Sequence, residues 1–320
     1  MNEVINGYEL MMPFSNKGAG FSRWTLAAKE TREFFLKEFM NPVYPMEVAL
    51  ENEIKQQRIE ECEEFEKKKV LLYKEINALS DGNIVRIYEF FRCDSHYYIS
   101  TERIVSQDLS YKEIQKYPIE ERVLLCKIIA HAIMKLHEHK IVHADLKENN
   151  ILLKMTQMKK ITAKIIDFDC SFFEDDPPKY EDELGGDQVY LAPEACMFMC
   201  GEPVKLTCKI DVFSLGIIFH QILAGVFPWF DSEQYDYVFE AVLDSQPLGI
   251  SSVLDSGLRK MIRKMLVADA EKRISMQEVY LILEKAYHDL KKEDTSETPV
   301  NNTDTPESDT DPWFHTAGDL

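Results

Sequence analysis

The sequence predicts an α+β fold of two lobes: a small N-terminal lobe with a five-stranded antiparallel sheet and one long helix, and a larger, mainly α-helical C-terminal lobe. Two observations predict this arrangement. Apolar and aromatic runs of strand length, separated by polar turns, fill residues 8–39 and 84–101. Beyond residue 106 apolar residues recur at helical spacing, with only short strands between them. We expect the first lobe to span residues 1–103 and the second 104–291.

Five segments of the first lobe have the composition of strands, and one has the pattern of a helix. Apolar residues at helical spacing run through the charged segment 46–79, which the breaker Ser-Asp-Gly-Asn at 80–83 closes. This pattern predicts one long, exposed helix between the third and fourth strands. The expected strands are 8–12, 21–27, 33–39, 84–91 and 96–101.

The second lobe is expected to contain helices at 120–139 and 211–225 and short strands at 151–153 and 164–167. Residues 292–320 are mostly Asp, Glu, Ser, Thr, Pro and Asn. Such a segment cannot bury enough apolar surface to offset the entropy that is lost on ordering. We therefore expect it to be an acidic, disordered tail.

The net charge indicates which binding partners are disfavoured, and the cysteine content indicates the cellular compartment. The formal net charge is -19, of which the eight acidic residues of 293–320, without any Lys or Arg, account for -8. An acidic chain disfavours nucleic acid and anionic membranes as partners. The first residues include no basic region, and no apolar run approaches the roughly 20 residues of a membrane span. Seven cysteines, an odd number, fit a reducing compartment, so we expect a cytoplasmic protein.

Two polar segments carry side chains that suit phosphoryl transfer. In the loop 143–150, between an expected helix and an expected strand, Asp145 precedes Asn150 by five positions, and a later apolar strand ends at Asp167. Phosphoryl transfer requires a carboxylate near the acceptor hydroxyl, oxygen ligands for the metal ions on ATP, and a cation for the phosphates. Either segment alone is more often an ordinary surface loop. The assignment of these two segments to phosphoryl transfer depends on two further segments of the chain.

Four segments stand out along the chain. They are His-Ala-Asp-Leu-Lys-Glu-Asn-Asn at 143–150, Ile-Ile-Asp-Phe-Asp at 165–169, Tyr-Leu-Ala-Pro-Glu at 190–194 and Asp-Val-Phe-Ser-Leu-Gly at 211–216. They are similar to the catalytic loop, the Asp-Phe-Gly motif, the Ala-Pro-Glu motif and the helix whose Asp holds the catalytic loop in protein kinases, and order and spacing agree from Gly18 to Arg273. The chain therefore resembles the eukaryotic-like Ser/Thr protein kinase family, and within it a soluble bacterial member. The resemblance implies a bilobal protein-kinase fold and a pairing of Glu194 with Arg273.

The resemblance implies ATP and Mg²⁺, or Mn²⁺, as cofactors and gives roles to five side chains. Asp145 would orient the acceptor hydroxyl, and Lys147 would steady the transferred phosphoryl group. Asn150 and Asp167 would bind the metal. Lys37, which follows Phe-Phe-Leu, would be the lysine of the Val-Ala-Ile-Lys motif that holds the α- and β-phosphates.

Further nucleotide contacts are implied in the first lobe. Gly18 and Gly20 would cover the phosphates, because residues without side chains let backbone amides approach them. Arg23 stands at the third glycine position, and Thr25 stands in place of the valine over adenine. After the strand 96–101, the gatekeeper would be Thr101, and the backbone groups that bond adenine would belong to Glu102 and Ile104.

The carboxylate expected to pair with Lys37 is assigned to the long helix. A gap-free match to the family would place Leu72 at this position. We select Glu66 instead, because it shares a helical face with apolar residues, namely Cys62, Val70 and Tyr73.

The loop that resembles the catalytic loop has lost an arginine. Ala144 replaces the residue that, in many kinases, reads a phosphate on the activation segment. Between Asp167 and Glu194 the hydroxyls are Ser171, Tyr180 and Tyr190, in a strongly acidic segment where added phosphate would add repulsion. We therefore expect activity that does not depend on phosphorylation of this segment.

The favoured function is an ATP-dependent protein kinase that phosphorylates Ser and Thr of protein substrates, with a cognate phosphatase as a further partner. Lys147 favours Ser/Thr over Tyr. An ATP-binding pseudokinase scaffold stays open as the alternative, because Arg23, Asp169 and Asp187 depart from the family pattern and the two acids add negative charge near the metal. Small-molecule kinases of the aminoglycoside type share a similar Asp and Asn. The Ala-Pro-Glu at 192–194 and Asp211 argue against that third class.

Overall fold

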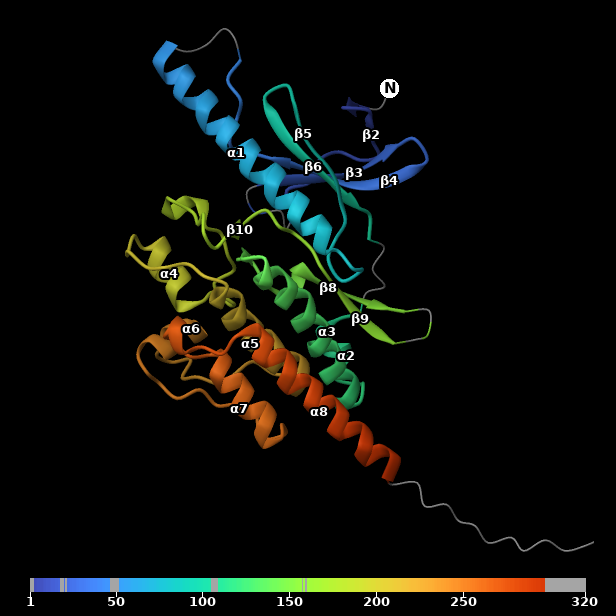
Figure 1. Cartoon of the computed structure of the whole chain (residues 1–320), viewed down its shortest axis with the longest axis vertical. Helices are drawn as coiled ribbons and strands as arrows, with labels where there is room; N and C mark the ends of the chain where they lie inside the picture. Colours follow the sequence, from blue (N-terminus) through green and yellow to red (C-terminus); the bar gives the residue numbers. More distant parts are fainter. Residues whose placement is uncertain are drawn as a thin grey trace, which may run out of the picture.

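The computed structural model describes residues 3–17, 20, 22–46, 52–104, 109–156, 158 and 160–296. A sheet and one long helix form one lobe, and a group of helices forms the other, below it in Figure 1. The sheet lies within residues 4–102, and the helices of the second lobe follow from residue 111. The predicted α+β architecture of two lobes is confirmed.

The sheet is antiparallel and has six strands in the order β1-β2-β3-β4-β6-β5. This is one strand more than the five predicted, because β1 has only two residues, too few for an alternating pattern to reveal it. The β3-β4 hairpin sets Trp24 opposite Lys37. The strands are β1 (Val4–Ile5), β2 (Tyr8–Leu10), β3 (Ser22–Lys29), β4 (Arg32–Phe39), β5 (Ile87–Cys93) and β6 (His96–Glu102).

Helix α1 (Asn52–Leu79) is the predicted long helix, and aromatic packing fixes its orientation on the sheet (Figure 1). The ring centroid of Phe65 lies 5.6 Å from that of Phe39 and 5.2 Å from that of Tyr97. Cys62 and Ile76 are buried on the same side of the helix. Edge-to-face aromatic pairs add about 0.5–1.5 kcal/mol each beyond their buried area. This cluster determines which side chains of α1 face the second lobe.

Helix α5 (Lys209–Ala224) forms the centre of the second lobe. Nearly all of its residues are buried, including the charged Asp211 in its first turn. A Cβ atom on Gly216 would lie 2.8 Å from the side chain of Leu266, so glycine permits the close packing of this helix. The other helices are α2 (Tyr111–Ile114), α3 (Ile119–Glu138), α4 (Pro193–Met199), α6 (Val238–Leu243), α7 (Ser256–Met265) and α8 (Met276–Ser296).

Short strands between the lobes carry the polar loops. They form two antiparallel pairs, β7 (Ile141–Val142) with β10 (Phe172–Phe173) and β8 (Ile151–Met155) with β9 (Ile161–Ile165). At the end of β9, the N–H of Ile165 donates to Asn83 O at 2.7 Å, and its carbonyl oxygen accepts the N–H of Val85 at 2.8 Å. The strand that leads to Asp167 is thus tied to the segment between α1 and β5.

The last helix passes the predicted end of the second lobe. Helix α8 runs to Ser296, beyond the predicted start of the tail at residue 292. Lys291, Lys292 and Glu293 have good helix propensity, which explains the extension. The rest of the predicted tail, 297–320, lies outside the described residues. Among the helices that the structure describes, none is both long and apolar enough to cross a membrane.

Candidate active site

The carboxylate of Asp211, on helix α5, holds the loop 143–150. Asp211 Oδ2 accepts the N–H of His143 at 2.8 Å, and Oδ1 accepts the N–H of Ala144 at 2.9 Å. Asp211 Oδ2 also lies 2.9 Å from Nε2 of His137, on α3. Ala144 has a φ of +66°, a left-handed conformation that costs a non-glycine residue about 1–2 kcal/mol. The buried carboxylate maintains this strained backbone, as the kinase resemblance implies.

The two carboxylate oxygens of Asp145 differ in their contacts with the described residues: Oδ2 accepts two hydrogen bonds and Oδ1 accepts none. Lys147 Nζ donates to Asp145 Oδ2 at 2.8 Å, and Asn150 Nδ2 donates to the same atom at 2.9 Å. Asn150 Nδ2 also bonds to the backbone oxygen of Asp145 at 2.7 Å. Asp145 Oδ1 is buried and accepts no hydrogen bond from the described residues. Because an unsatisfied buried acceptor is costly, Oδ1 is suited to receive a hydrogen bond from another molecule.

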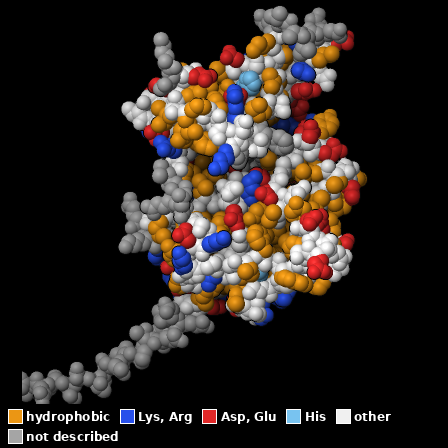
Figure 2. All heavy atoms as spheres, turned by 180° about the vertical axis from the view of Figure 1, so that it is seen from behind, with side chains coloured by type: hydrophobic (Ala, Val, Ile, Leu, Met, Phe, Trp, Pro, Cys, Tyr) orange, Lys and Arg blue, Asp and Glu red, His pale blue; other side chains and the backbone are white. Residues whose placement is uncertain are grey.

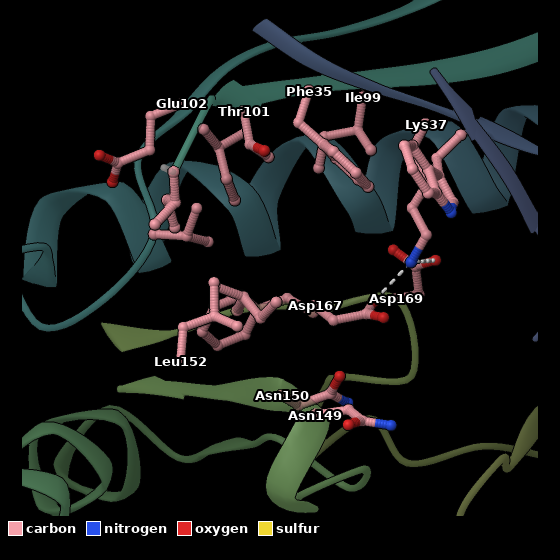
Figure 3. A pocket seen from close by; sticks show the side chains of 16 residues that line it. Phe35, Lys37, Ile99, Thr101, Glu102, Asn149, Asn150, Leu152, Asp167 and Asp169 are labelled. Carbon is pink, nitrogen blue, oxygen red and sulfur yellow. Dashed lines mark hydrogen bonds and ion pairs between the residues drawn. The ribbon is translucent and has the colours of Figure 1, made fainter. Parts of the chain in front are cut away.

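Lys37 lies between two carboxylates at the back of the cleft. Its Nζ is 2.7 Å from Asp167 Oδ1 and 2.7 Å from Asp169 Oδ2 (Figure 3). Burial by itself would lower the pKa of Lys37, but Asp169 and Asp167 outweigh it and raise the pKa above its usual value. Burial opposes ionisation of Asp167, yet Lys37 holds the pKa of that carboxyl below its usual range. The cation and the Asp167 carboxylate are therefore both charged at neutral pH.

The predicted pairing of Lys37 with Glu66 is wrong in this structure. Glu66 is exposed, and among the described residues it forms no ion pair with Lys37. Val70, which was expected to share its buried face, is 50% exposed. Glu66 therefore lies at the edge of the helix surface that packs on the protein, and Leu72 packs into the apolar core instead of the cleft.

Lys69, on helix α1, reaches the site, although it was not among the predicted site residues. Its Nζ donates to the backbone oxygen of Asp169 at 2.5 Å. The nitrogen lies 6.0 Å from the ring centroid of Phe65 and 5.7 Å from that of Tyr73. These residues are one helical turn before and after Lys69. Their spacing was the sequence signal that could have found it.

A cavity of about 320 Å³ lies between the lobes. In the space-filling view the surface is hollowed between the lobes, with basic and acidic side chains close together (Figure 2). Lys37, Asn150 and Asp167 line one end of the cavity, and Thr101 and Glu102 line the other (Figure 3). Ile104 is also a lining residue. Apolar side chains also line the cavity, namely Val85, Ile87, Ile99, Leu152, Ile166 and Phe168. This combination of an apolar slot and a charged end suits a nucleotide.

The roof of the cavity is aromatic. The rings of Trp24, on β3, and Phe35, on β4, stack at 5.2 Å between centroids and both line the cavity. Thr25, which was expected over adenine, is fully buried on the other face of the strand and donates to Met12 O at 2.6 Å. A strand alternates its faces at every residue, so an assignment shifted by one residue selects the wrong side chain.

The expected glycine loop is described only in part. Gly18 lies outside the described residues, whereas Gly20 has a φ of +55°, which favours glycine. Arg23, expected at the third glycine position, belongs to β3 and pairs with Glu38 at 2.9 Å. Trp24 Nε1 donates to Lys17 O at 2.9 Å and so fixes one end of this loop.

At the other end of the cavity, the side chain of Glu102 points to the protein. Its Oε1 accepts the N–H of Arg86 at 2.9 Å and Lys164 Nζ at 2.5 Å. The N–H of Glu102 donates to Arg86 O at 3.0 Å, so the contacts expected with adenine are limited to its carbonyl group and the backbone of Ile104.

The segment 168–194 is anchored at both ends. Glu194 accepts two hydrogen bonds from Arg273, at 2.7 and 2.9 Å, and both side chains are buried, which confirms this predicted pair. Ser171 Oγ donates to His143 O at 3.0 Å, and Ser171 and Tyr190 are buried. Tyr180, by contrast, is 63% exposed.

Comparison with solved structures identifies the fold. The structure of the kinase PK-1 from Cydia pomonella granulovirus matches with a TM-score of 0.59 and 18% sequence identity, over 87% of this chain and 93% of the viral one. The fold is thus that of protein kinases. The family model of the protein kinase domain matches residues 47–282. The chain belongs to the protein kinase family.

Curated relatives are protein kinases as well. Calcium-dependent protein kinase 4 of Plasmodium falciparum is 28% identical over 63% of this chain and 38% of its own length. The yeast fatty acyl-CoA synthetase and RNA processing-associated kinase 1 is 30% identical over 67% of this chain and 25% of its own length. The Caenorhabditis elegans serine/threonine-protein kinase kin-29 is 32% identical over 64% of this chain and 24% of its own length. The chain therefore spans well under half the length of these relatives.

Proposed function

We propose that this chain transfers the γ-phosphoryl group of ATP to Ser and Thr hydroxyls of protein substrates. The observation that carries the proposal is the Asp145 carboxylate. Lys147 and Asn150 fix its Oδ2, while its buried Oδ1 accepts no hydrogen bond from the residues that the structure describes. A carboxylate held in this way can accept the proton of an incoming hydroxyl. Lys147, which marks Ser/Thr kinases by resemblance, supports the choice of acceptor.

The donor set fits a divalent cation bound to ATP. Asp167 offers a carboxylate, and Asn150 uses its Nδ2 on Asp145, which leaves the amide oxygen for a ligand. Hard cations such as Mg²⁺ prefer oxygen ligands of this kind. When bound, the metal would neutralise charge on the phosphates. Lys37 would hold the α- and β-phosphates, and the apolar slot below Trp24 and Phe35 would take the adenine.

The experiment measures transfer from labelled ATP, with Mg²⁺ or Mn²⁺, to a generic basic protein. Asp145→Asn keeps the size of the side chain but removes the base, so we expect transfer to fall by about 10²–10⁴-fold. Asp236→Asn, on an exposed residue away from the cavity, is the matched control. Phosphoamino-acid analysis should find phosphoserine and phosphothreonine. Equal transfer by wild type and Asp145→Asn would refute the proposal, and nucleotide binding without transfer would favour a pseudokinase scaffold.

We also propose that activity does not require phosphorylation of the segment 168–194. Ser171 and Tyr190 are buried, and the acidic segment is already joined to helix α1 by ion pairs, Asp176 with Lys68 at 3.0 Å and Lys179 with Glu64 at 2.8 Å. Ala144 has no positive charge with which to bind a phosphate on this segment. Phosphatase treatment should leave the transfer rate unchanged, with Ser171 bare by mass spectrometry. A loss of activity that maps to Ser171 or Tyr180 would contradict this.

A cytoplasmic location and a cognate phosphatase complete the proposal. The cysteines that the structure describes are all free thiols, which fits a reducing compartment. A phosphoryl group on a hydroxyl is removed by hydrolysis, so reversal of the reaction calls for a phosphatase. Fractionation of cells, with the chain detected by antibody, tests the location.

A further inference from the structure

Four charged residues, namely Lys37, Lys69, Asp167 and Asp169, meet at the charged end of the cavity. Their arrangement is the reverse of what the kinase resemblance implies. The resemblance to protein kinases implies a carboxylate on the long helix and a glycine at position 169, after Asp167 and Phe168. Here helix α1 presents Lys69, and residue 169 is an aspartate. Lys37 and Lys69 both contact Asp169, the first through its carboxylate at 2.7 Å and the second through its backbone oxygen at 2.5 Å.

We propose that Asp169 and Lys69 are positioning residues that together replace the helix glutamate. Asp169 supplies the carboxylate that holds Lys37, and Lys69 supplies the link between helix α1 and the segment that begins at Asp167. The inference rests on the proposed binding of ATP. It gives a reason for Asp169 other than loss of function.

Charge balance explains why the two substitutions belong together. Lys37 and Asp169 are largely buried, with 8% and 21% of their side chains exposed. An aspartate at 169 in place of glycine adds a negative charge beside Asp167, and a buried charge needs a partner. Lys69 brings a second amine to the same place, so two lysines lie beside two aspartates, although burial lowers the pKa of Lys69 and raises that of Asp169. A glutamate at position 69 would instead put three carboxylates around one lysine.

The second carboxylate also frees Asp167 for a different ligand. If Asp167 binds the metal, it can no longer be the main partner of Lys37. Asp169 then keeps Lys37 in place, because its own contact does not involve the metal ligands Asn150 and Asp167. Lys69 is held from its other side by the rings of Phe65 and Tyr73, and Tyr73 is only 3% exposed.

A reciprocal exchange tests the proposal. The proteins are the wild type, Asp169→Gly, Lys69→Glu, the double variant Asp169→Gly/Lys69→Glu, and Lys67→Glu as a matched control on an exposed side of the same helix. The readouts are the Kd for a non-hydrolysable ATP analogue with Mg²⁺, by calorimetry, and kcat and KM for ATP. We expect each single variant to weaken analogue binding by about tenfold or more, and the double variant to recover most of it, since directly coupled charges give strongly non-additive effects. Lys67→Glu should stay near wild type.

Two results would overturn the proposal: an Asp169→Gly variant that binds the analogue as tightly as wild type, or a double variant whose loss is the sum of the single losses. Circular dichroism and thermal unfolding check that each variant folds. If Asp169→Gly fails to fold, Asp169→Asn, which keeps the shape and removes the charge, takes its place with the same expectation.

The analogue separates this inference from the proposed transfer reaction. A wild type that binds the analogue but transfers no phosphate refutes the transfer reaction, and the binding cycle still decides the roles of Asp169 and Lys69. A wild type that transfers phosphate, combined with a double variant that is not rescued, refutes only the inference. A wild type that binds no nucleotide refutes both.

Discussion

Ala144 donates its backbone N–H to the buried Asp211 carboxylate at 2.9 Å, and this bond holds Ala144 in a left-handed conformation. The neighbouring bond from His143 reaches the other carboxylate oxygen at 2.8 Å. The loop that carries Asp145 is thus fixed from the core of the second lobe instead of from the surface. This dependence leads to the first prediction.

Asp211→Asn should lower both stability and transfer. The amide keeps one acceptor oxygen but turns an N–H₂ group toward a backbone donor, so a buried hydrogen bond is lost and the free energy of unfolding should fall by about 1–3 kcal/mol. Urea denaturation measures this change. Asp236→Asn, on an exposed residue, should leave the unfolding curve in place. An unchanged transfer rate in Asp211→Asn would show that the loop does not need this anchor.

Trp24→Ala should weaken ATP binding more than it affects folding. An aromatic surface under a nucleobase contributes about 1–3 kcal/mol per base, and Trp24 provides that surface in the roof of the cavity. Calorimetry with Mg²⁺ and an ATP analogue measures the loss. Trp229→Ala is the control, because Trp229 is 67% exposed and is not among the residues lining the cavity. Equal affinities of the two variants for the ATP analogue would show that Trp24 does not contribute to nucleotide binding.

Arg273→Ala should be among the most destabilising single changes in the second lobe. It leaves the buried carboxylate of Glu194 without its two hydrogen bonds, and breaking such a buried pair costs about 3–5 kcal/mol. Arg273→Lys should recover only part of this, since an ammonium cannot form the paired geometry. Lys272→Ala, next to it in an exposed ion pair, should leave the urea midpoint nearly unchanged. Comparable midpoints for Arg273→Ala and Lys272→Ala would contradict the prediction.

Stability should fall as the pH drops below about 6.5, in part because of His220. Burial lowers the pKa of His220 from its usual value, and its ring is hydrogen-bonded to Val226 O at 2.7 Å and to the N–H of Ser251 at 3.0 Å. At low pH the unfolded chain gains a proton that the folded chain resists, so acid favours unfolding. Urea curves between pH 7.5 and 5.5 measure the slope. His220→Gln should flatten it, whereas His288→Gln, on an exposed residue, should not.

The local motifs could be predicted from the sequence because their residues are close along the chain. The loop around Asp145, the strand end at Asp167 and the Glu194 segment each keep their order and spacing whatever the rest of the chain does. Long-range contacts such as Glu194 with Arg273 followed only from the family resemblance. Propensity and periodicity contain no information on which distant segments meet.

The side chains of β3 and α1 that point toward the site were harder to predict, for geometric reasons. In a strand, one step along the chain changes the face, and so Trp24 lies over the cavity where Thr25 was expected. In helix α1, Glu66 and Lys69 are three residues apart. Glu66 lies at the edge of the helix surface that packs on the protein, and Lys69 lies near the middle of that surface. The aromatic residues of the sheet decide this rotation, and they belong to other segments of the chain.

The stacked pair in the roof of the cavity also bears on chemical selectivity. In the kinase motif Val-Ala-Ile-Lys, the position of Phe35 is a small alanine, whereas here a phenyl ring stacks on the Trp24 indole. Flat inhibitors shaped for a small aliphatic ceiling would meet two broad aromatic surfaces in this chain. Compounds that exploit face-to-face stacking at this ceiling would discriminate between this chain and relatives that keep the alanine.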